Sequence, residues 1–352
     1  MNTQPTGMWT AALLCLSLLS FNLNADPSEH HGHLQWTMED LLESQSYPFA
    51  IGHRGYGAND GSDTSRPIEN SIDAVRRAFL EGIQVVEVDV VQTLDGKAVA
   101  LHDDYLDDFT CVNQLTFDEL KTRLPSVAKL KQILHAARRF SRKRHSERPS
   151  GLVIVEIKTP SPLCDPDDSS QLSLTEAVVS DITKSRMTEQ VLIESFSPEI
   201  LGLVAERAPQ LPRTLAISAF QLLTPEMIEA YTGLPVTLME KSSPFGLQWV
   251  EAGTLFRAPL YGSANDYLFT LSASLSRAAS IDKAVIQLLE SQAPGTSSLL
   301  IAQLHQIGQR AMVYTVNDEA EWLLLATLGV DGIYTDDVPM GLALEGIGST
   351  AP

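Results

Sequence analysis

The sequence predicts an α/β protein, a (β/α)8 TIM barrel with a small insertion after the third strand. Short apolar segments rich in β-branched residues alternate with amphipathic stretches, a pattern typical of parallel βα units. These segments are apolar on both sides, as strands are when helices cover one face and layers of side chains fill the other. A doubly wound open sheet is the alternative, but no Gly-rich phosphate loop follows the first segment.

Eight segments carry the strand pattern, which is the number that such a barrel needs. We expect strands at 49–53, 85–91, 98–102, 152–157, 191–196, 214–218, 311–316 and 332–335. The clearest helix is expected over 71–81, where Ile72, Val75 and Phe79 fall on one face and Gly82 ends the helix. Residues 224–297 hold more chain than one βα unit needs, and we assign no element there.

The composition limits both size and partners. A chain of 352 residues corresponds to one large domain or two ordinary ones, and it suffices for a sizeable core. With 25 Lys and Arg against 44 Asp and Glu, the formal net charge is -19, which repels the backbone of a nucleic acid. We therefore expect no nucleic-acid partner. A basic run at 138–148 is interpreted as a solvated helix end.

The N-terminal region indicates export. Residues 8–23 form an apolar run without a charged side chain, and Ala25 precedes a polar stretch. We expect a signal peptide over 1–25, a polar segment over 26–48 and the barrel domain over 49–345. An uncleaved anchor and a lipoprotein attached through Cys15 are the alternatives. No other apolar run approaches the roughly 20 residues that span a bilayer, so we expect a periplasmic or secreted protein without stable membrane insertion of the mature chain.

Removal of this leader would leave Cys111 and Cys164 as the only thiols. In an oxidising compartment the two could form a disulfide, or they could be two unpaired core cysteines. The sequence leaves both possibilities open, because the separation along the chain does not say whether the Cα atoms lie within bridging distance.

Carboxylates interrupt two of the predicted strands. Glu87 and Asp89 lie in a run otherwise built from valine, and because strand side chains alternate, both point the same way. Glu156 and Lys158 share a face at the end of a second such run. The flanking valines favour burial over an outward, salt-bridged face, and a divalent cation would compensate buried carboxylates. Such hard oxygen ligands suit calcium or magnesium better than zinc.

Two histidines end predicted strands, His53 in the first and His102 in the third. The C-terminal strand ends are where barrel enzymes hold their catalytic groups. A pair of histidines beside three carboxylates favours an acid/base pair over two structural residues. Arg54 and Lys158 would supply positive charge to a phosphate.

Taken together, nine short motifs resemble the glycerophosphodiester phosphodiesterase family, in the family's order, from about residue 51 to about residue 337. They are His53-Arg54-Gly55, Glu69-Asn70, Glu87-x-Asp89-Val90, Thr93-x-Asp95-Gly96, His102-Asp103, Glu156-Ile157-Lys158, Ser195-Phe196, Thr315-Val316-Asn317 and Asp331-Gly332-Ile333-x-Thr335-Asp336.

The resemblance implies a barrel that hydrolyses a glycerophosphodiester, such as glycerophosphocholine or glycerophosphoethanolamine, to sn-glycerol 3-phosphate and an alcohol. It implies one divalent cation, for which we expect calcium in preference to magnesium. The positions that match the family's metal ligands are Glu87, Asp89 and Glu156; those that match its acid/base pair are His53 and His102; those that match its phosphate contacts are Arg54 and Lys158. Glu69 and Asn70 match a pair for which we expect a support or substrate role.

Two departures from the family's pattern, and one insertion that the family shares, surround the predicted mouth of the barrel. The loop at 56–68 is longer than the family's and would overhang the site. Tyr314 replaces a tryptophan that many members carry, which keeps an aromatic wall against the substrate. The segment 104–125 matches the position of the family's insertion, where Leu106 and Phe109 would line the mouth.

The mechanism that we expect uses the cation and Arg54 to neutralise the phosphodiester, with one histidine deprotonating the nucleophile and the other protonating the leaving alcohol. Water or the adjacent glycerol hydroxyl could be the nucleophile, and the sequence leaves this and the division of labour between the histidines open. The alternatives are a phospholipase D-like lipid phosphodiesterase of the same fold, a catalytically silent binding barrel and a sugar-processing barrel. The oligomeric state is also open.

Overall fold

The computed structural model describes residues 35–43, 48–143, 147–161, 163–218 and 277–347. The predicted signal peptide and residues 224–276 of the stretch that received no assignment lie outside the described residues. In the described part of the chain, no helix is both long and apolar enough to cross a membrane.

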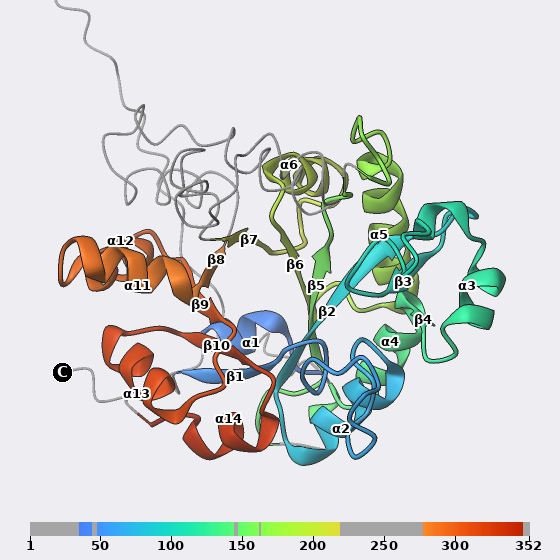
Figure 1. Ribbon diagram of the computed structural model, residues 1–352. Coiled ribbons are helices and arrows are strands. Elements are labelled where there is room, and N and C mark those ends of the chain that lie inside the picture. Colours follow the sequence, from blue (N-terminus) through green and yellow to red (C-terminus); the bar gives the residue numbers. More distant parts are fainter. Residues whose placement is uncertain (1–34, 44–47, 144–146, 162, 219–276, 348–352) are drawn as a thin grey trace, which may run out of the picture. The chain divides into compact units, whose positions relative to one another are not determined.

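Eight parallel strands form a closed barrel, which confirms the predicted fold class (Figure 1). Each strand pairs with the next one around the barrel, and β1 pairs with both β2 and β10, which closes the ring. The barrel strands are β1 (Phe49–Gly52), β2 (Val85–Gln92), β5 (Leu152–Ile157), β6 (Val191–Ser195), β7 (Arg213–Ile217), β8 (Ala278–Asp282), β9 (Arg310–Tyr314) and β10 (Gly332–Thr335).

The predicted number of barrel strands is right, but one assignment is wrong. The segment predicted at 98–102 forms β3 (Ala98–Ala100), which runs antiparallel to β2 and pairs in turn with β4 (Ala128–Lys129). The missing barrel strand is β8, in the stretch that received no assignment. A hairpin strand and a barrel strand are both short and apolar, so composition does not separate them. The insertion therefore follows the second barrel strand.

The insertion has a small core of its own. It contains a 3-10 helix (Val112–Gln114) and α3 (Phe117–Arg123), which begins with a capping box between Thr116 and Glu119. Val91 of β2 and Val99 of β3 form one side of this core, and Val112, Leu120 and Val127 of the insertion form the other.

The helices that cover the barrel have apolar faces packed on the strands. The first, α2 (Ile72–Glu81), has Ser71 as its N-cap and ends at Gly82, as predicted. The others are α4 (Leu130–Ala137), α5 (Gln171–Ser185), α6 (Pro198–Arg207), α11 (Lys283–Gln292), α12 (Thr296–Gln306), α13 (Glu319–Leu328) and α14 (Val338–Leu344).

A short helix, α1 (Met38–Leu42), closes the amino-terminal end of the barrel. Its buried side chains Met38, Leu41 and Leu42 belong to the same apolar cluster as Phe49 and Met312 of the strands. Part of the stretch that the sequence assigns to a polar segment is thus packed against the barrel.

The basic run that begins at Arg138 follows the end of α4, as expected, but part of it is paired with other segments. The ammonium of Lys143 lies 4.6 Å from the ring centroid of Trp36 and 3.6 Å from a carboxylate oxygen of Asp40. Arg148 pairs with Glu345 near the end of the barrel.

Candidate active site

Three buried carboxylates meet at the carboxyl ends of β2 and β5. Asp89 lies directly opposite Glu156 in the strand register, and Glu87 lies two residues before Asp89, on the same face. One ligand oxygen from each lies within 4.8 Å of the other two. The side chains are nearly inaccessible to solvent, with exposed fractions of 2% for Glu87, 1% for Asp89 and 8% for Glu156. The structure thus brings together the three residues predicted as metal ligands.

The chemistry of this cluster fits a divalent cation. One buried oxygen of Glu87, Oε1, has no hydrogen-bond partner among the described residues. Burial raises the pKa of Glu87 well above its ordinary value, and the charges of Asp89 and Glu156 raise it further. Hard oxygen donors crowded in this way are the ligands that calcium and magnesium prefer, and a cation would relieve their repulsion.

Two cations border the carboxylates. The ammonium of Lys158 lies 2.8 Å from Glu156 Oε1 and 3.3 Å from Asp89 Oδ1, and Arg54 Nε lies 3.6 Å from Asp89 Oδ2. Burial opposes ionisation of Asp89, but Lys158, His102 and Arg54 outweigh it and lower the pKa of this carboxyl. Asp89 is therefore an anion that lies between the positive charges of Arg54 and Lys158.

The turn after β1 presents His53 and Arg54 to this cluster. A Cβ atom at Gly52 would lie 2.3 Å from the carbonyl oxygen of Gly55, and Gly55 itself has a φ of +90°. Only glycine satisfies both positions without displacement of the backbone. Arg54 has a left-handed φ of 50°, which is uncommon for a residue with a side chain, and its N–H donates to Glu87 Oε2 at 2.8 Å.

Each of the two predicted catalytic histidines has a carboxylate partner at Nδ1. His53 Nδ1 lies 2.7 Å from Asp336 Oδ1, and His102 Nδ1 lies 2.8 Å from Asp103 Oδ1. A ring whose Nδ1–H donates to a carboxylate has Nε2 as the atom that accepts or donates a proton in a reaction.

A network around Asp336 holds it against His53. Asn317 Nδ2 donates to Asp336 Oδ2 at 2.8 Å, and the N–H of Ala58 donates to Oδ1 at 2.6 Å. Burial raises the pKa of Asp336, but the hydrogen bond and charge of His53, with the donors from Ala58 and Asn317, lower it overall. Asp103, Asp336 and Asn317 belong to motifs that carry the family resemblance, but no role was predicted for them.

His102 reaches the site by a different path from the one predicted. Because β3 runs antiparallel to β2, the chain returns to the carboxyl end of β2, where Leu101 N–H donates to Asp89 O at 3.1 Å. The expectation that His102 ends a barrel strand is wrong, whereas its expected place beside the carboxylates is right.

Glu69 and Asn70 support the site from the start of α2. The amide of Asn70 donates from Nδ2 to Asp89 Oδ2 at 2.8 Å, and its Oδ1 accepts the backbone N–H of Asp89 at 3.0 Å. Glu69 Oε1 accepts a hydrogen bond from Arg54 at 2.8 Å. These contacts fix one ligand and one cation, which agrees with a support role for the pair.

The long loop at 56–68 is built around Asn59, whose side chain is 6% exposed. Its Nδ2 donates to three backbone carbonyls of the loop, and its backbone N–H donates to Glu69 Oε2. Arg66 donates to the carbonyl oxygens of Tyr56 and Asp336. The loop is thus attached to the carboxylate partner of His53.

Tyr314 contributes a ring to the aromatic wall. Its centroid lies 6.1 Å from that of Phe196, edge to face, and the ammonium of Lys158 lies 6.0 Å from the Phe196 centroid. The Tyr314 hydroxyl donates to Ile217 O at 2.8 Å, so it is already engaged within the barrel.

A fourth buried carboxylate was not predicted from the sequence. Glu194 of β6 lies opposite Glu156 in register and is 3% exposed. It accepts a hydrogen bond of 2.6 Å from the hydroxyl of Tyr334. Burial and the charge of Glu156 raise the pKa of Glu194 to about 8. A glutamate inside an apolar strand was the available signal, the same one that identified Glu87.

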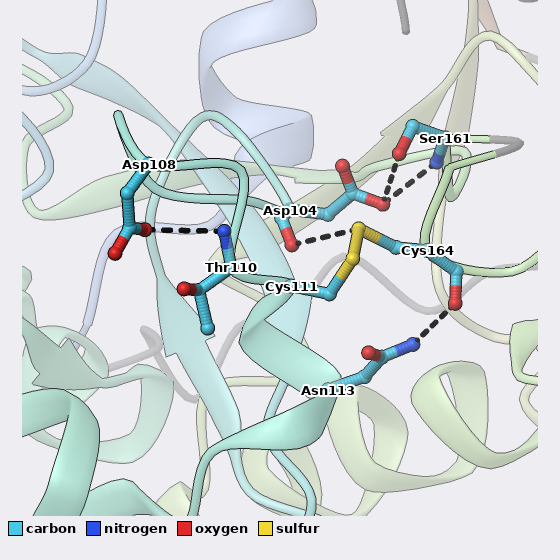
Figure 2. Close-up of a disulfide and its surroundings, with 7 residues drawn as sticks. All are labelled: Asp104, Asp108, Thr110, Cys111, Asn113, Ser161 and Cys164. Carbon is cyan, nitrogen blue, oxygen red and sulfur yellow. Dashed lines mark hydrogen bonds between the residues drawn. A yellow bond between two sulfur atoms is a disulfide. The ribbon is translucent and has the colours of Figure 1, made fainter.

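Cys111 and Cys164 form a disulfide with Cα atoms 5.5 Å apart. Figure 2 shows that it joins the insertion to the loop after β5, beside a second link in which Asp104 accepts hydrogen bonds from the N–H and hydroxyl of Ser161. Asn113 donates to Cys164 O at 2.7 Å. Of the two possibilities that the sequence left open, the structure has the disulfide.

Several solved structures share this fold. A glycerophosphoryl diester phosphodiesterase from Silicibacter pomeroyi superposes with a TM-score of 0.60, at 19% identity over 88% of this chain and 99% of its own. The glycerophosphodiester phosphodiesterase of Thermotoga maritima superposes with a TM-score of 0.55, at 18% identity over 85% of this chain and 98% of its own. An Oleispira antarctica phosphodiesterase in complex with the product sn-glycerol-3-phosphate superposes with a TM-score of 0.54, at 19% identity over 84% of this chain and 97% of its own.

Sequence comparison gives the family directly. A curated glycerophosphodiester phosphodiesterase from Caldanaerobacter subterraneus is 29% identical over 178 residues, which are 46% of this chain and 63% of that relative, so the match spans less than two thirds of the relative's length. The model of the glycerophosphoryl diester phosphodiesterase family matches residues 53–245 and 246–340. The match covers most of the chain and includes every predicted site residue, and the chain therefore belongs to the glycerophosphoryl diester phosphodiesterase family.

Proposed function

We propose that the chain hydrolyses glycerophosphodiesters, such as glycerophosphocholine or glycerophosphoethanolamine, to sn-glycerol 3-phosphate and an alcohol. The observation that carries the proposal is the pair of histidines, each with its own carboxylate, beside a buried carboxylate triad and two cations. Family membership and the product held by the Oleispira antarctica structure support the same reaction.

In this proposal Glu87, Asp89 and Glu156 hold one divalent cation, calcium in preference to magnesium. The cation would supply positive charge to an oxygen of the phosphodiester as negative charge grows there. The oxygen donors of the triad support a hard cation, and they are compatible with either metal.

The protein's own groups bind the phosphate and move the protons. Arg54 and Lys158 bind the phosphate oxygens, and Glu69 and Asn70 keep Arg54 and Asp89 in place. One histidine accepts the nucleophile's proton at Nε2, while its carboxylate stabilises the resulting imidazolium. The other donates its Nε2 proton to the alcohol oxygen as the phosphorus–oxygen bond breaks, so that the proton count balances.

The nucleophile is water or the glycerol hydroxyl next to the phosphate, which would give a cyclic phosphate first. A glycerophosphocholine analogue that lacks this hydroxyl separates the two routes. Full turnover of the analogue would exclude the internal route, and loss of turnover with unchanged binding would support it.

We also propose that the mature chain acts outside the cytoplasm. The predicted signal peptide supports export, and the Cys111–Cys164 disulfide is the kind of bond that persists in an oxidising compartment. Mass measurement of the protein from a periplasmic or culture fraction would test both, because the cleaved mass and the oxidised cysteines are visible together.

The main experiment measures release of glycerol 3-phosphate from glycerophosphocholine by the purified mature chain, with calcium, with magnesium and with a chelator. We expect cation-dependent release that falls roughly 10²- to 10⁴-fold in His53→Ala. The control is His135→Ala, an exposed histidine on α4, which should leave the rate unchanged. Cleavage of lysophosphatidylcholine instead would indicate the lipid phosphodiesterase, and binding of cation and substrate without product would indicate a silent barrel.

A further inference from the structure

A groove with a volume of about 530 Å³ lies on the outside of the barrel, where α4 and α5 meet the paired strands β3 and β4. Figure 1 shows α4 and α5 beside these two strands. Six permanent cations line the groove, and they are Lys97, Lys129, Lys131, Arg138, Lys184 and Arg186. None of them belongs to the candidate active site.

The charge of this groove opposes that of the rest of the chain. The lining contains one carboxylate, Asp181, against the six cations, which is an excess of five positive charges. Since the whole chain carries -19, the remainder carries -24. Like charges held together repel each other, so the groove is a place where an anion is attracted and where binding would relieve the repulsion.

Five of the six cations have no counterion at contact distance. Among the described residues, no carboxylate oxygen lies within 4.0 Å of the charged groups of Lys129, Lys131, Arg138, Lys184 or Arg186, whereas Lys97 pairs with Asp95 at 3.9 Å. Outside the groove, Arg77 and Arg123 each pair with a nearby carboxylate.

Asp181 shows that the groove excludes some of the solvent. Burial raises the pKa of Asp181, although the charges of Lys131, Lys184 and Lys97 lower it. A carboxylate is thus partly desolvated inside a ring of cations. An anion bound there would also lose part of its water, which strengthens its attraction to the ammonium groups.

Arg186 occupies a backbone position that favours glycine. It caps the C-terminal end of α5 with a left-handed φ of 54°. A side chain costs energy in this conformation, and glycine is the usual residue at such a cap. The sequence nevertheless has a cation there, at the lining of the groove.

We propose that this α4–α5 groove binds a soluble molecule that carries two or more phosphate groups. The volume lies in the range of small-molecule sites, and several point charges spread along a groove match several phosphates better than one. The apolar side chains in the lining, Ala98 and Ala177, are small, and the other neutral side chains there are polar. A membrane-binding surface would carry larger apolar side chains among the basic residues, so a soluble ligand fits better.

The test is calorimetric titration of the full chain with tripolyphosphate at low salt, in the presence of a chelator. We expect saturable binding that weakens as salt is added. The double variant Lys131→Ala/Lys184→Ala should weaken it at least tenfold and leave the hydrolysis of glycerophosphocholine unchanged. The matched control is Arg76→Ala/Lys283→Ala, which removes two cations outside the groove and should change the affinity less than twofold.

A second variant should strengthen the binding of tripolyphosphate instead of weakening it. Asp181→Asn removes the carboxylate from the groove and keeps an acceptor, so we expect tighter binding of tripolyphosphate. Circular dichroism establishes that each variant is folded.

Four results would overturn the proposal: no binding by the folded wild-type chain, equal weakening in the control pair, displacement of tripolyphosphate by glycerol 3-phosphate, and binding to phosphatidylglycerol vesicles alone. The third would place the ligand in the candidate active site, and the fourth would make the groove a membrane-binding surface.

Discussion

Asp336 Oδ1 lies 2.7 Å from Nδ1 of His53, and this contact joins the residues that follow the last and the first strands of the barrel. The two strands are neighbours because the barrel is closed, with Gly52 paired to Thr335. Closure of the barrel therefore creates the histidine–carboxylate pair.

Asp336→Asn should lower kcat by about 10- to 100-fold while KM changes little, because the amide neither holds the His53 ring in one tautomer nor stabilises its protonated form. Steady-state kinetics with glycerophosphocholine measures both constants. Asp337→Asn is the control, since Asp337 caps α14 through Met340 N–H and does not contact His53. An equal loss of kcat in both variants would contradict a positioning role for Asp336.

Glu87→Gln should raise the thermal stability of the protein when no cation is present and should remove the stabilisation that a cation gives. In a chelator the variant should unfold at a higher temperature than the wild type, because one of three mutually repelling buried carboxylates is gone. Calcium or magnesium should stabilise the wild type, by about 2.7 kcal/mol at 100 times the dissociation constant, and should not stabilise the variant. Glu69→Gln, which leaves the triad intact, should keep the cation-induced shift in thermal denaturation. A full shift in Glu87→Gln would place the cation elsewhere.

Glu194→Gln should remove a pH dependence of stability. The pKa of Glu194 is raised to about 8 in the folded chain, against about 4.3 in an unfolded one. Between these values the unfolded state releases the proton that the folded state keeps, so the free energy of unfolding falls as pH rises toward 8.

Glutamine has no such proton, so the free energy of unfolding of the variant should not depend on pH in this way. At pH 8 it should exceed that of the wild type by a few kcal/mol, on the order of the pKa shift, and near pH 4 the two should be nearly equal. Urea denaturation in the presence of a chelator measures this difference. The exposed Glu206→Gln should behave as the wild type at both values. Parallel curves for Glu194→Gln and the wild type would show that Glu194 is ionised in the folded chain.

Reduction of the disulfide should destabilise the protein by roughly 2–4 kcal/mol, since the bond closes a loop of 53 residues whose entropy it restricts in the unfolded state. Denaturation with and without dithiothreitol measures this difference. Cys111→Ala/Cys164→Ala should resemble the reduced wild type and should not respond to dithiothreitol. The same midpoint for the oxidised and reduced protein would mean that the contacts of Ser161 and Asn113 alone hold the two loops together.

The sequence predicts the barrel because periodicity and burial are local properties of a strand. Val85 to Gln92 is rich in valine and buried on both faces, and that pattern leaves few architectures. It does not separate Ala98–Ala100 from a barrel strand, because strand direction depends on pairing with distant residues. It also gives no signal for β8, whose segment Ala278–Asp282 contains small and polar residues.

Some residues of the candidate site have a local signal in the sequence, and others do not. Glu87, Asp89 and Glu156 could be found because a carboxylate inside an apolar run is anomalous by itself. The roles of Asp336 and Asn317 depend on contacts across the ring of strands and had no local signature. Glu194 had the same signature as Glu87 and was overlooked, and Tyr334, which donates to it, looks like an ordinary core residue in the sequence.

The antiparallel β3 brings His102 to the site before the insertion begins in the chain. The pairing of Ala100 with Val90 sets the position of this histidine, and both residues precede the segment that contains Cys111 and α3. That segment packs its apolar side chains on Val91 of β2 and Val99 of β3, and it returns to the sheet at β4. A chain with a different insertion between Asp104 and Val127 would therefore have to cover Val91 and Val99 with other apolar side chains, while the pairing of β3 with β2 that places His102 would stay the same.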